Sequence, residues 1–134
     1  MTTEFNWPIR VYYEDTDAGG VVYHANYLRY YERARTEWLN QLKIKHVDML
    51  ASGVAFVVTK ADIDYLKPAT LNDKLVIKST IIKTTPARII FEQAIWRNDL
   101  LLNRATIYVA CLKIDTFSPC RIQKTIKEEF QRVS

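Results

Sequence analysis

The spacing of apolar and polar positions changes along the chain, and each change predicts a new element. A β-branched and aromatic run at residues 9–13 predicts a first strand, with Pro8 tolerated at its start. Residues 14–23 are expected to form a loop. Residues 24–42 place apolar side chains every three or four positions, which predicts a long amphipathic helix. The members of this stripe are Tyr27, Tyr31, Ala34, Trp38 and Leu42.

The rest of the chain is dominated by alternation with a period of two. A short helix is expected at 47–51, ended by Ser52 and Gly53. Alternating patterns then predict four strands, at residues 57–65, 74–83, 88–97 and 103–114. In the first of these, one face is expected to hold Val57, Thr59, Ala61, Ile63 and Tyr65. The turns between the later strands are short, so those strands should pair antiparallel.

A helix of 19 residues is about 28 Å long, and a strand of ten residues about 33 Å. These matching lengths favour an α+β fold in which a sheet of about five antiparallel strands curls around one long helix. Ile122, Ile126 and Phe130 predict a further helix near the C-terminus, basic on its other face. Its amphipathic character fits a membrane surface, but packing on its own domain is favoured. At 134 residues, one domain spanning 1–134 is expected.

Composition excludes several classes of protein. No apolar run approaches the ~20 residues of a membrane span, and the N-terminus lacks a basic start followed by an apolar stretch, so we expect a cytoplasmic protein. Cys111 and Cys120 have no CxxC spacing and no neighbouring His. We therefore expect neutral thiols, with neither a zinc site nor a redox pair. His46 stands alone in a polar stretch and is expected on the solvated surface.

The net charge of +4 comes from Lys and Arg spread along the chain, without a basic run. This distribution argues against nucleic-acid binding. It is compatible with a small ligand that carries phosphates, because a few convergent cations are enough to hold one.

Residues 14–27 concentrate the chain's rare residue types, with two of its three Gly and one of its two His. Gly19 and Gly20 allow a backbone to approach a ligand closely. The helix start expected near His24 offers free amides that can polarise a carbonyl oxygen. The ionised Asp17 carboxylate can serve as nucleophile or base. A purely structural explanation is also open, in which Asp17 caps a turn that the glycines shape.

This segment resembles the signature of the YbgC-type acyl-CoA thioesterases, within the 4-hydroxybenzoyl-CoA thioesterase family of hotdog-fold proteins. The resemblance rests on the run Val-Tyr-Tyr-Glu-Asp-Thr-Asp-Ala-Gly-Gly-Val-Val-Tyr-His-Ala-Asn-Tyr at 11–27 and on Tyr-Glu-Arg-Ala-Arg-Thr-Glu at 31–37. It implies a hotdog fold, homodimers that often pair into tetramers, and hydrolysis of acyl-CoA, with coenzyme A as part of the substrate and no cofactor.

The resemblance also implies roles for individual residues. Asp17 would be the catalytic carboxylate, and the amide at His24 would polarise the thioester carbonyl. Substrate contacts are expected at Tyr13, Gly19, Gly20, Val21, Tyr23, Asn26 and Tyr27. By charge and strand position alone, Lys60, Lys83 and Arg88 are candidates for the CoA phosphates. No metal is expected.

Two other functions are weighed against hydrolysis. The first is an interaction module that links acyl carrier protein or phospholipid-synthesis enzymes to the Tol-Pal envelope system, with peripheral contact at the inner membrane. The second is a hotdog dehydratase, which would pair His24 with Glu32 or Glu37.

Overall fold

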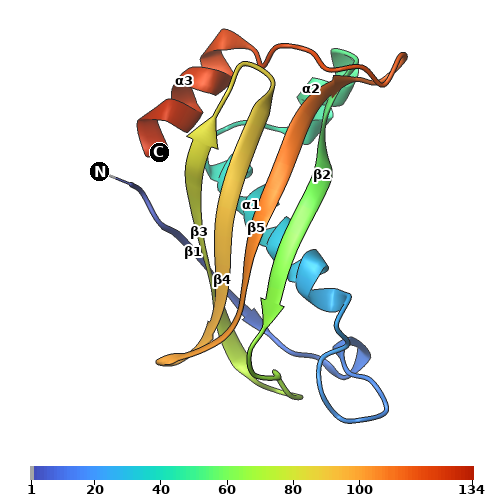
Figure 1. The fold of residues 1–134 in the computed structure, drawn as a ribbon, viewed down its shortest axis with the longest axis vertical. Helices are drawn as coiled ribbons and strands as arrows, with labels where there is room; N and C mark the ends of the chain where they lie inside the picture. Colours follow the sequence, from blue (N-terminus) through green and yellow to red (C-terminus); the bar gives the residue numbers. More distant parts are fainter. Residues whose placement is uncertain (1) are drawn as a thin grey trace.

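The computed structural model describes residues 2–134, and its centre is a single sheet of five antiparallel strands in the order β1-β3-β4-β5-β2 (Figure 1). The strands are β1 (Phe5–Arg10), β2 (Val54–Tyr65), β3 (Lys74–Thr84), β4 (Arg88–Arg97) and β5 (Leu100–Lys113). The helices are η1 (Tyr13–Asp15), α1 (Asn26–Gln41), α2 (His46–Ala51) and α3 (Lys124–Val133). The α+β class and the strand count predicted from the sequence are confirmed.

Helix α1 packs on one face of the sheet, which we call the inner face, and the core lies between them. The whole predicted apolar stripe is buried or half-buried, and Tyr31 and Trp38 are nearly inaccessible to solvent. Trp38 meets the β4 side chain Phe91 edge to face, at 6.2 Å between ring centroids. The outer face of the sheet carries no helix in Figure 1, so its side chains stand toward solvent.

The first strand begins four residues earlier than predicted and ends three residues earlier, at Phe5–Arg10 in place of 9–13. It pairs only with β3, and a strand at the edge of a sheet tolerates Pro8 in its interior. The chain then turns into η1, because the Asp15 carboxylate accepts a hydrogen bond from the Tyr12 amide at 2.9 Å. Within the run at residues 9–13 that predicted the strand, only Val11 is fully buried, and Tyr12 and Tyr13 are exposed.

Strand β2 carries a bulge between Val58 and Lys60 that the alternation did not reveal. Val58 lies opposite Val109 and Ala61 opposite Ile107, and both partners are buried on the inner face. The sequence predicted Val57 and Thr59 on the same face as Ala61. The bulge adds one residue and so reverses the alternation, which places Val58 on that face instead.

Helix α3 packs against its own domain, as favoured from the sequence. Phe130 and Val133 are buried, and the Phe130 ring lies 6.0 Å from that of Phe56. Within residues 2–134, no helix combines the length and apolarity needed to cross a membrane.

Candidate active site

The segment that holds Asp17 is a small hairpin closed by the pairing of Thr16 with Val22. The Asp17 amide donates to the Val21 carbonyl at 2.9 Å, and the Gly20 amide donates to the Asp17 carbonyl at 3.0 Å. One carboxylate oxygen of Asp17, Oδ1, accepts the Gly19 amide at 2.8 Å. The side chain is exposed, and its Oδ2 has no hydrogen-bond donor among residues 2–134. One oxygen thus fixes the side chain, while the other is open to solvent.

The two glycines have different tasks in this hairpin. Gly20 has a φ of +79°, the left-handed region that only glycine adopts cheaply. Gly19 does not, but a Cβ there would come within 3.2 Å of Asp17 Oδ1. Gly19 therefore leaves room for the carboxylate, and Gly20 closes the turn.

Helix α1 begins at Asn26, two residues later than predicted, so His24 lies just before the helix. The Tyr23 amide donates to the Asp15 carbonyl of η1, and the Asn26 amide donates to the Tyr23 carbonyl, at 2.9 Å each. The amides of His24 and Ala25 have no backbone acceptor among the described residues. The expected free donor at His24 is therefore present, although it precedes the first helical turn.

Aromatic rings and strand β2 hold the chain at His24. The Tyr65 hydroxyl, on the last residue of β2, donates to the His24 carbonyl at 3.1 Å. The imidazole packs against the half-exposed Tyr23 ring at 4.5 Å between centroids. His24, Tyr27 and Tyr65 line a shallow cavity of about 220 Å³ at this end of the sheet.

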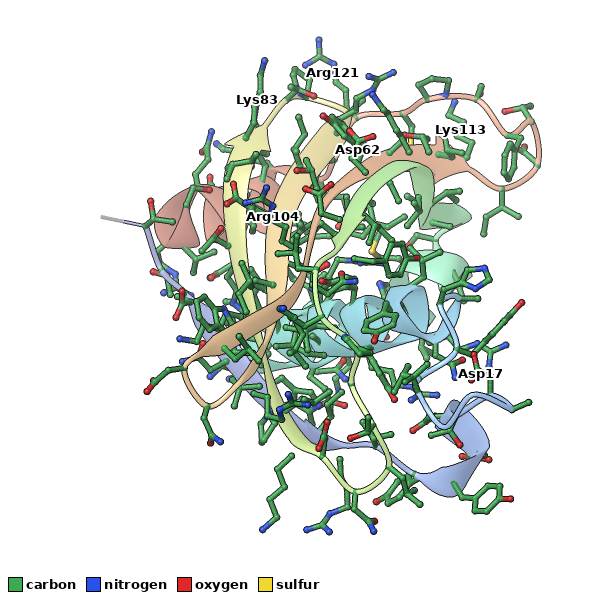
Figure 2. The ribbon with its side chains drawn as sticks, turned by 60° about the horizontal axis from the view of Figure 1, so that its bottom comes forward. Asp17, Asp62, Lys83, Arg104, Lys113 and Arg121 are labelled. Carbon is green, nitrogen blue, oxygen red and sulfur yellow. The ribbon has the colours of Figure 1, made fainter. Side chains whose placement is uncertain are left out.

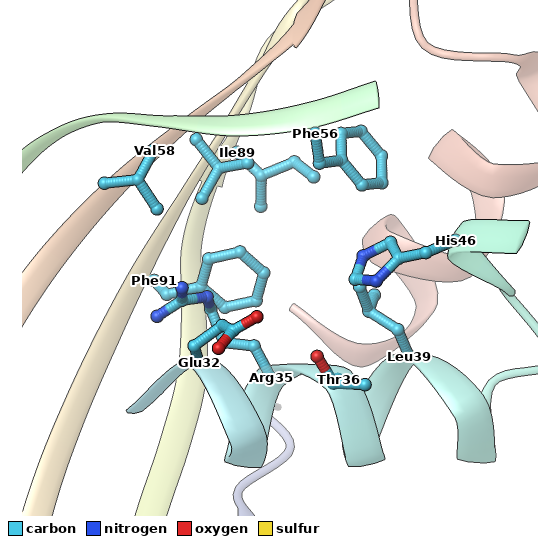
Figure 3. A pocket seen from close by; sticks show the side chains of 10 residues that line it. Glu32, Arg35, Thr36, Leu39, His46, Phe56, Val58, Ile89 and Phe91 are labelled. Atoms are coloured by element: carbon cyan, nitrogen blue, oxygen red, sulfur yellow. The ribbon is translucent and has the colours of Figure 1, made fainter. Parts of the chain in front are cut away.

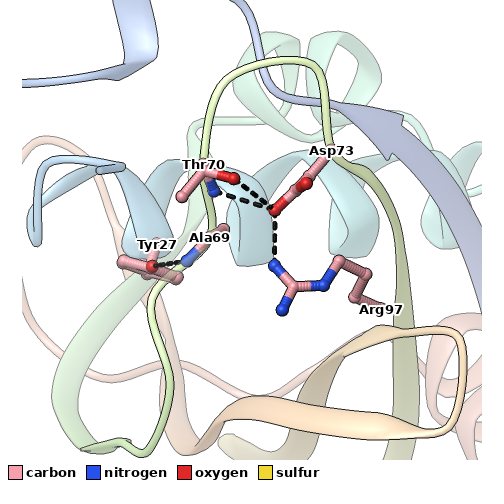
Figure 4. Close-up of polar contacts among 5 residues, drawn as sticks. All are labelled: Tyr27, Ala69, Thr70, Asp73 and Arg97. Atoms are coloured by element: carbon pink, nitrogen blue, oxygen red, sulfur yellow. Dashed lines mark hydrogen bonds and ion pairs between the residues drawn. The ribbon is translucent and has the colours of Figure 1, made fainter. Parts of the chain in front are cut away.

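Asn26 and Tyr27 are buried, and both side chains form hydrogen bonds within the protein. Asn26 Nδ2 donates to the Asp15 carbonyl at 2.9 Å, which ties the helix start to η1. The Tyr27 hydroxyl accepts the Ala69 amide at 3.2 Å (Figure 4), and burial raises the pKa of this phenol. Tyr13, also expected at the site, is 81% exposed and points into solvent in the single chain.

The segment after β2 supports the hairpin from the other side. Val21 pairs with Thr70, and the Val22 amide donates to the Ala69 carbonyl at 2.9 Å. Thr70 is in turn held by Asp73, whose Oδ2 accepts the Thr70 amide at 2.8 Å and Arg97 Nη1 at 2.7 Å (Figure 4). Burial by itself raises the pKa of Asp73, but the hydrogen bonds from Thr70 and Arg97 outweigh it and hold that pKa below its ordinary value.

The three predicted phosphate contacts lie on the outer face. Lys60 opposes Tyr108, Tyr108 opposes Ile90, and Ile90 opposes Lys83, so both lysines stand in one row across four strands. Arg88 lies two residues before Ile90 on the same face. The Lys83 end of the sheet is far from Asp17 within one chain (Figure 2). The fold thus gathers these three cations on one face, and it places Lys83 away from the Asp17 hairpin.

Sequence reasoning missed a second cavity, of about 290 Å³, between α1 and the inner face (Figure 3). Its helix side is polar and includes Glu32, Arg35 and Thr36, whereas its sheet side is apolar. Phe56 and Val58 of the edge strand β2 form part of the wall. The cavity therefore reaches the open edge of the sheet.

The unusual group in this cavity is Arg35, which is only 7% exposed. Its Nη1 donates to Gln93 Oε1 at 2.9 Å, and the guanidinium lies 5.9 Å from the centre of the Phe91 ring. Burial lowers its pKa to about 10, with the Glu32 carboxylate opposing that shift, so Arg35 is charged at neutral pH. In the sequence, Arg35 stands out as a charged residue within the apolar stripe of the helix. That position could have indicated a buried charge.

His46 also lies in this cavity, and its expected place on the solvated surface was wrong. It is half-buried, and its ring lies 6.4 Å from that of Phe56.

The dehydratase alternative required His24 beside Glu32 or Glu37. His24 and Glu32 line different cavities, and Glu37 lines neither, so the single chain does not form that pair.

Residues 11–130 match the thioesterase-like superfamily. The chain belongs to that superfamily. It is 45% identical over 130 residues to the acyl-CoA thioesterase YbgC of Haemophilus influenzae, covering 96% of each chain. It is 36% identical to the YbgC protein of Helicobacter pylori, covering 89% of this chain and 94% of that one. The YbgC resemblance and the expected hotdog fold are therefore confirmed.

A solved structure supports the same assignment. The DHNA-CoA thioesterase of Staphylococcus aureus superposes with a TM-score of 0.93 at 26% identity, covering 98% of this chain and 91% of that one. The superposition extends over nearly the whole of both chains, so the hairpin, α1 and all five strands belong to the common fold.

Proposed function

We propose that this thioesterase-like chain hydrolyses acyl-CoA thioesters to a carboxylic acid and free coenzyme A. The observation that carries the proposal is the Asp17 carboxylate, which is held through Oδ1 by the Gly19 amide and open at Oδ2. The amides of His24 and Ala25, which have no backbone acceptor within residues 2–134, follow on the same segment. The H. influenzae relative, named an acyl-CoA thioesterase, supports the choice of substrate class.

The chemistry needs a donor for the carbonyl oxygen and a carboxylate beside the carbonyl carbon. An amide at His24 stabilises the negative charge that develops on that oxygen, a contribution of roughly 3 kcal/mol for one donor. Asp17 then acts by one of two routes. It attacks the carbonyl, expels the CoA thiolate and forms a mixed anhydride that water cleaves, or it takes a proton from the water that attacks directly.

We further propose that two copies pair through their β2 edges to complete the site. β2 is a 12-residue strand with one side unpaired, a ready template for another strand. A two-fold axis near the bulge would place the Tyr65 end of one β2 beside Phe56 of the other. The Asp17 hairpin of one chain would then face the mouth of the partner chain's cavity, where the acyl group would enter. The pairing of two such dimers into a tetramer is part of this proposal.

The remaining site residues follow from this arrangement. Lys60, on the edge strand, is the nearest of the three candidate phosphate contacts to a substrate that crosses the β2 edge. Lys83 and Arg88 lie further along the outer face and are the less direct candidates. Tyr13, exposed in the single chain, is proposed to meet substrate only in the dimer.

A scaffolding role is the second candidate, favoured by the outer face of the sheet, which carries no helix and on which three exposed cations lie. Lys60, Lys83 and Arg88 on that face would complement an acidic protein such as acyl carrier protein. Such a role would place the protein in the cytoplasm, with peripheral contact at the inner membrane through phospholipid-synthesis enzymes and the Tol-Pal system. Partner capture that survives loss of Asp17 would favour scaffolding over hydrolysis.

The proposed activity is tested by thiol release from short, long-chain and aromatic acyl-CoAs. Asp17→Asn keeps an oxygen for the Gly19 amide and should fold normally, yet lose roughly 10³-fold or more of the rate, because the amide is neither nucleophile nor base. Asp99→Asn, in an exposed turn, is the matched control for charge. Equal rates for Asp17→Asn and wild type would refute the proposal.

A further inference from the structure

The two cysteines of the chain lie side by side, although their spacing in the sequence did not suggest a pair. The Sγ atoms of Cys111 and Cys120 are 3.4 Å apart. Cys111 is on β5, and Cys120 lies beyond the turn that follows β5. Because the two lie nine positions apart in the sequence, the contact is created by the path of the backbone between them.

The backbone holds this pair in place on both sides. The Cys120 amide donates to the Cys111 carbonyl at 2.9 Å, and the Lys113 amide donates to the Ser118 carbonyl at 2.9 Å. Between them, Leu112 pairs with Pro119. Cys111 and Cys120 therefore lie directly opposite each other on antiparallel segments, where Cα atoms are about 5.5 Å apart. That separation is within the range that disulfides span.

From this geometry we propose that Cys111 and Cys120 are a site of covalent modification, at which peroxide forms an intramolecular disulfide. The sulfurs need to approach by about 1.4 Å, to the 2.05 Å of an S–S bond. Rotations about the Cα–Cβ bonds can supply this movement without a change in the backbone pairing.

The order of events follows from exposure. Cys111 is 1% exposed, whereas Cys120 is partly exposed and meets the oxidant first. The Cys120 sulfur displaces one oxygen of hydrogen peroxide as water and becomes a sulfenic acid. The Cys111 sulfur then attacks the Cys120 sulfur and gives up its proton, and a second molecule of water leaves. Overall, two thiols are oxidised and one peroxide is reduced to two waters.

Burial raises the pKa of the Cys111 thiol to about 12, and the neighbouring Cys120 sulfur adds to this shift. Cys111 is therefore a poor first target for peroxide, because the thiolate is the reactive form. In the second step, the contact with Cys120 compensates for this low reactivity, because a group held next to its target reacts as if it were present at a very high concentration. The arrangement predicts a disulfide in preference to further oxidation of Cys120.

The bond would close a loop that contains the exposed side chains Ile114 and Phe117. It would restrict the unfolded chain and should raise Tm by roughly 5–10 °C. Neither cysteine lines the cavity next to Arg35 or the shallow cavity next to His24, so thioester hydrolysis should be unchanged. Formation of the disulfide does not depend on the proposed hydrolytic function.

The test treats the folded protein with hydrogen peroxide, quenches it, and measures intact mass and free thiols. We expect a loss of about 2 Da, loss of both thiols, a single peptide pair joined by the bond, and reversal by dithiothreitol. Cys111→Ser and Cys120→Ser, each folded by circular dichroism, should give no such product and no rise in Tm. Two titratable thiols after treatment, or oxygen addition at Cys120 with Cys111 still free, would overturn the proposal.

Discussion

The Tyr65 hydroxyl at the end of β2 donates a hydrogen bond to the His24 carbonyl, 3.1 Å away. This bond joins the edge strand of the sheet to the segment whose free amides we propose bind the substrate carbonyl. It therefore connects the surface proposed for pairing of two chains with the candidate active site.

Tyr65→Phe should lower the rate of acyl-CoA hydrolysis several-fold while lowering the free energy of unfolding by only about 0.5–1 kcal/mol, because both groups are partly exposed. Tyr12→Phe is the control, since the Tyr12 hydroxyl is exposed and makes no hydrogen bond within the described residues. Steady-state kinetics and urea unfolding separate the two effects. Equal rates for the two variants would mean that the bond does not position the amides.

The two positive-φ glycines allow a matched comparison of the Asp17 turn. Gly20 and Gly53 have φ of +79° and +77°, and at both positions an added Cβ would meet no atom within 4 Å. Substitution by Ala should cost each about 1–2 kcal/mol of stability from backbone strain. Only Gly20→Ala should also reduce hydrolysis, because it distorts the hairpin that orients Asp17. Similar rates in both variants would contradict that role.

The Asp73 carboxylate predicts a pH-dependent contribution to stability. Its pKa is depressed in the folded protein, so its contribution is complete above the ordinary carboxylate value of about 3.9 and is lost as the pH falls below it. Asp73→Asn should therefore cost about 1–2 kcal/mol at pH 7, and the difference from wild type should shrink in acid.

The control for Asp73 is the exposed ion pair between Asp64 and Arg104, at 2.9 Å with both side chains 60% exposed. Asp64→Asn should change the free energy of unfolding by less than about 0.5 kcal/mol at either pH. Urea unfolding at pH 7 and pH 3 makes the comparison. A pH-independent deficit in Asp73→Asn would show that the carboxylate charge is not the cause.

A shared site between two chains predicts complementation. Thr36→Trp should fill the cavity beside Arg35, and Asp17→Asn should remove the carboxylate, so each variant alone should be inactive. When the two are unfolded together and refolded, about half of the dimers are mixed, and one of the two sites in each is intact. Activity should return to about a quarter of wild type. No recovery would mean that hairpin and cavity act within one chain.

Local pattern predicted much of this protein correctly. Strand β4 has the predicted bounds, and β3 is one residue longer than expected. The stripe of α1 is buried as predicted, because a period of three to four leaves a helix only one apolar face. The rare residues at 14–27 likewise marked the segment that holds Asp17, which was expected to be a loop and which the structure closes into a hairpin.

The errors arose where a partner strand or a distant segment decides the outcome. The β2 bulge depends on how Val58 and Lys60 pair with β5, and a strand's own alternation contains no information about its neighbour. β1 lies nearer the N-terminus than expected because Pro8 is acceptable on an edge, and only the strand order reveals which strand is an edge.

The family was predicted from the resemblance of the motif at residues 11–27 and 31–37, and the α+β class from the spacing of apolar positions. Residues 14–23 were predicted only as the loop that carries Asp17. The three-dimensional packing was needed to show that Arg35 and His46 face one cavity and that the sulfurs of Cys111 and Cys120 meet. These relationships join residues on different elements. Their distances are set by the packing of α1 on the sheet and by the return of the chain alongside β5, which no local pattern encodes.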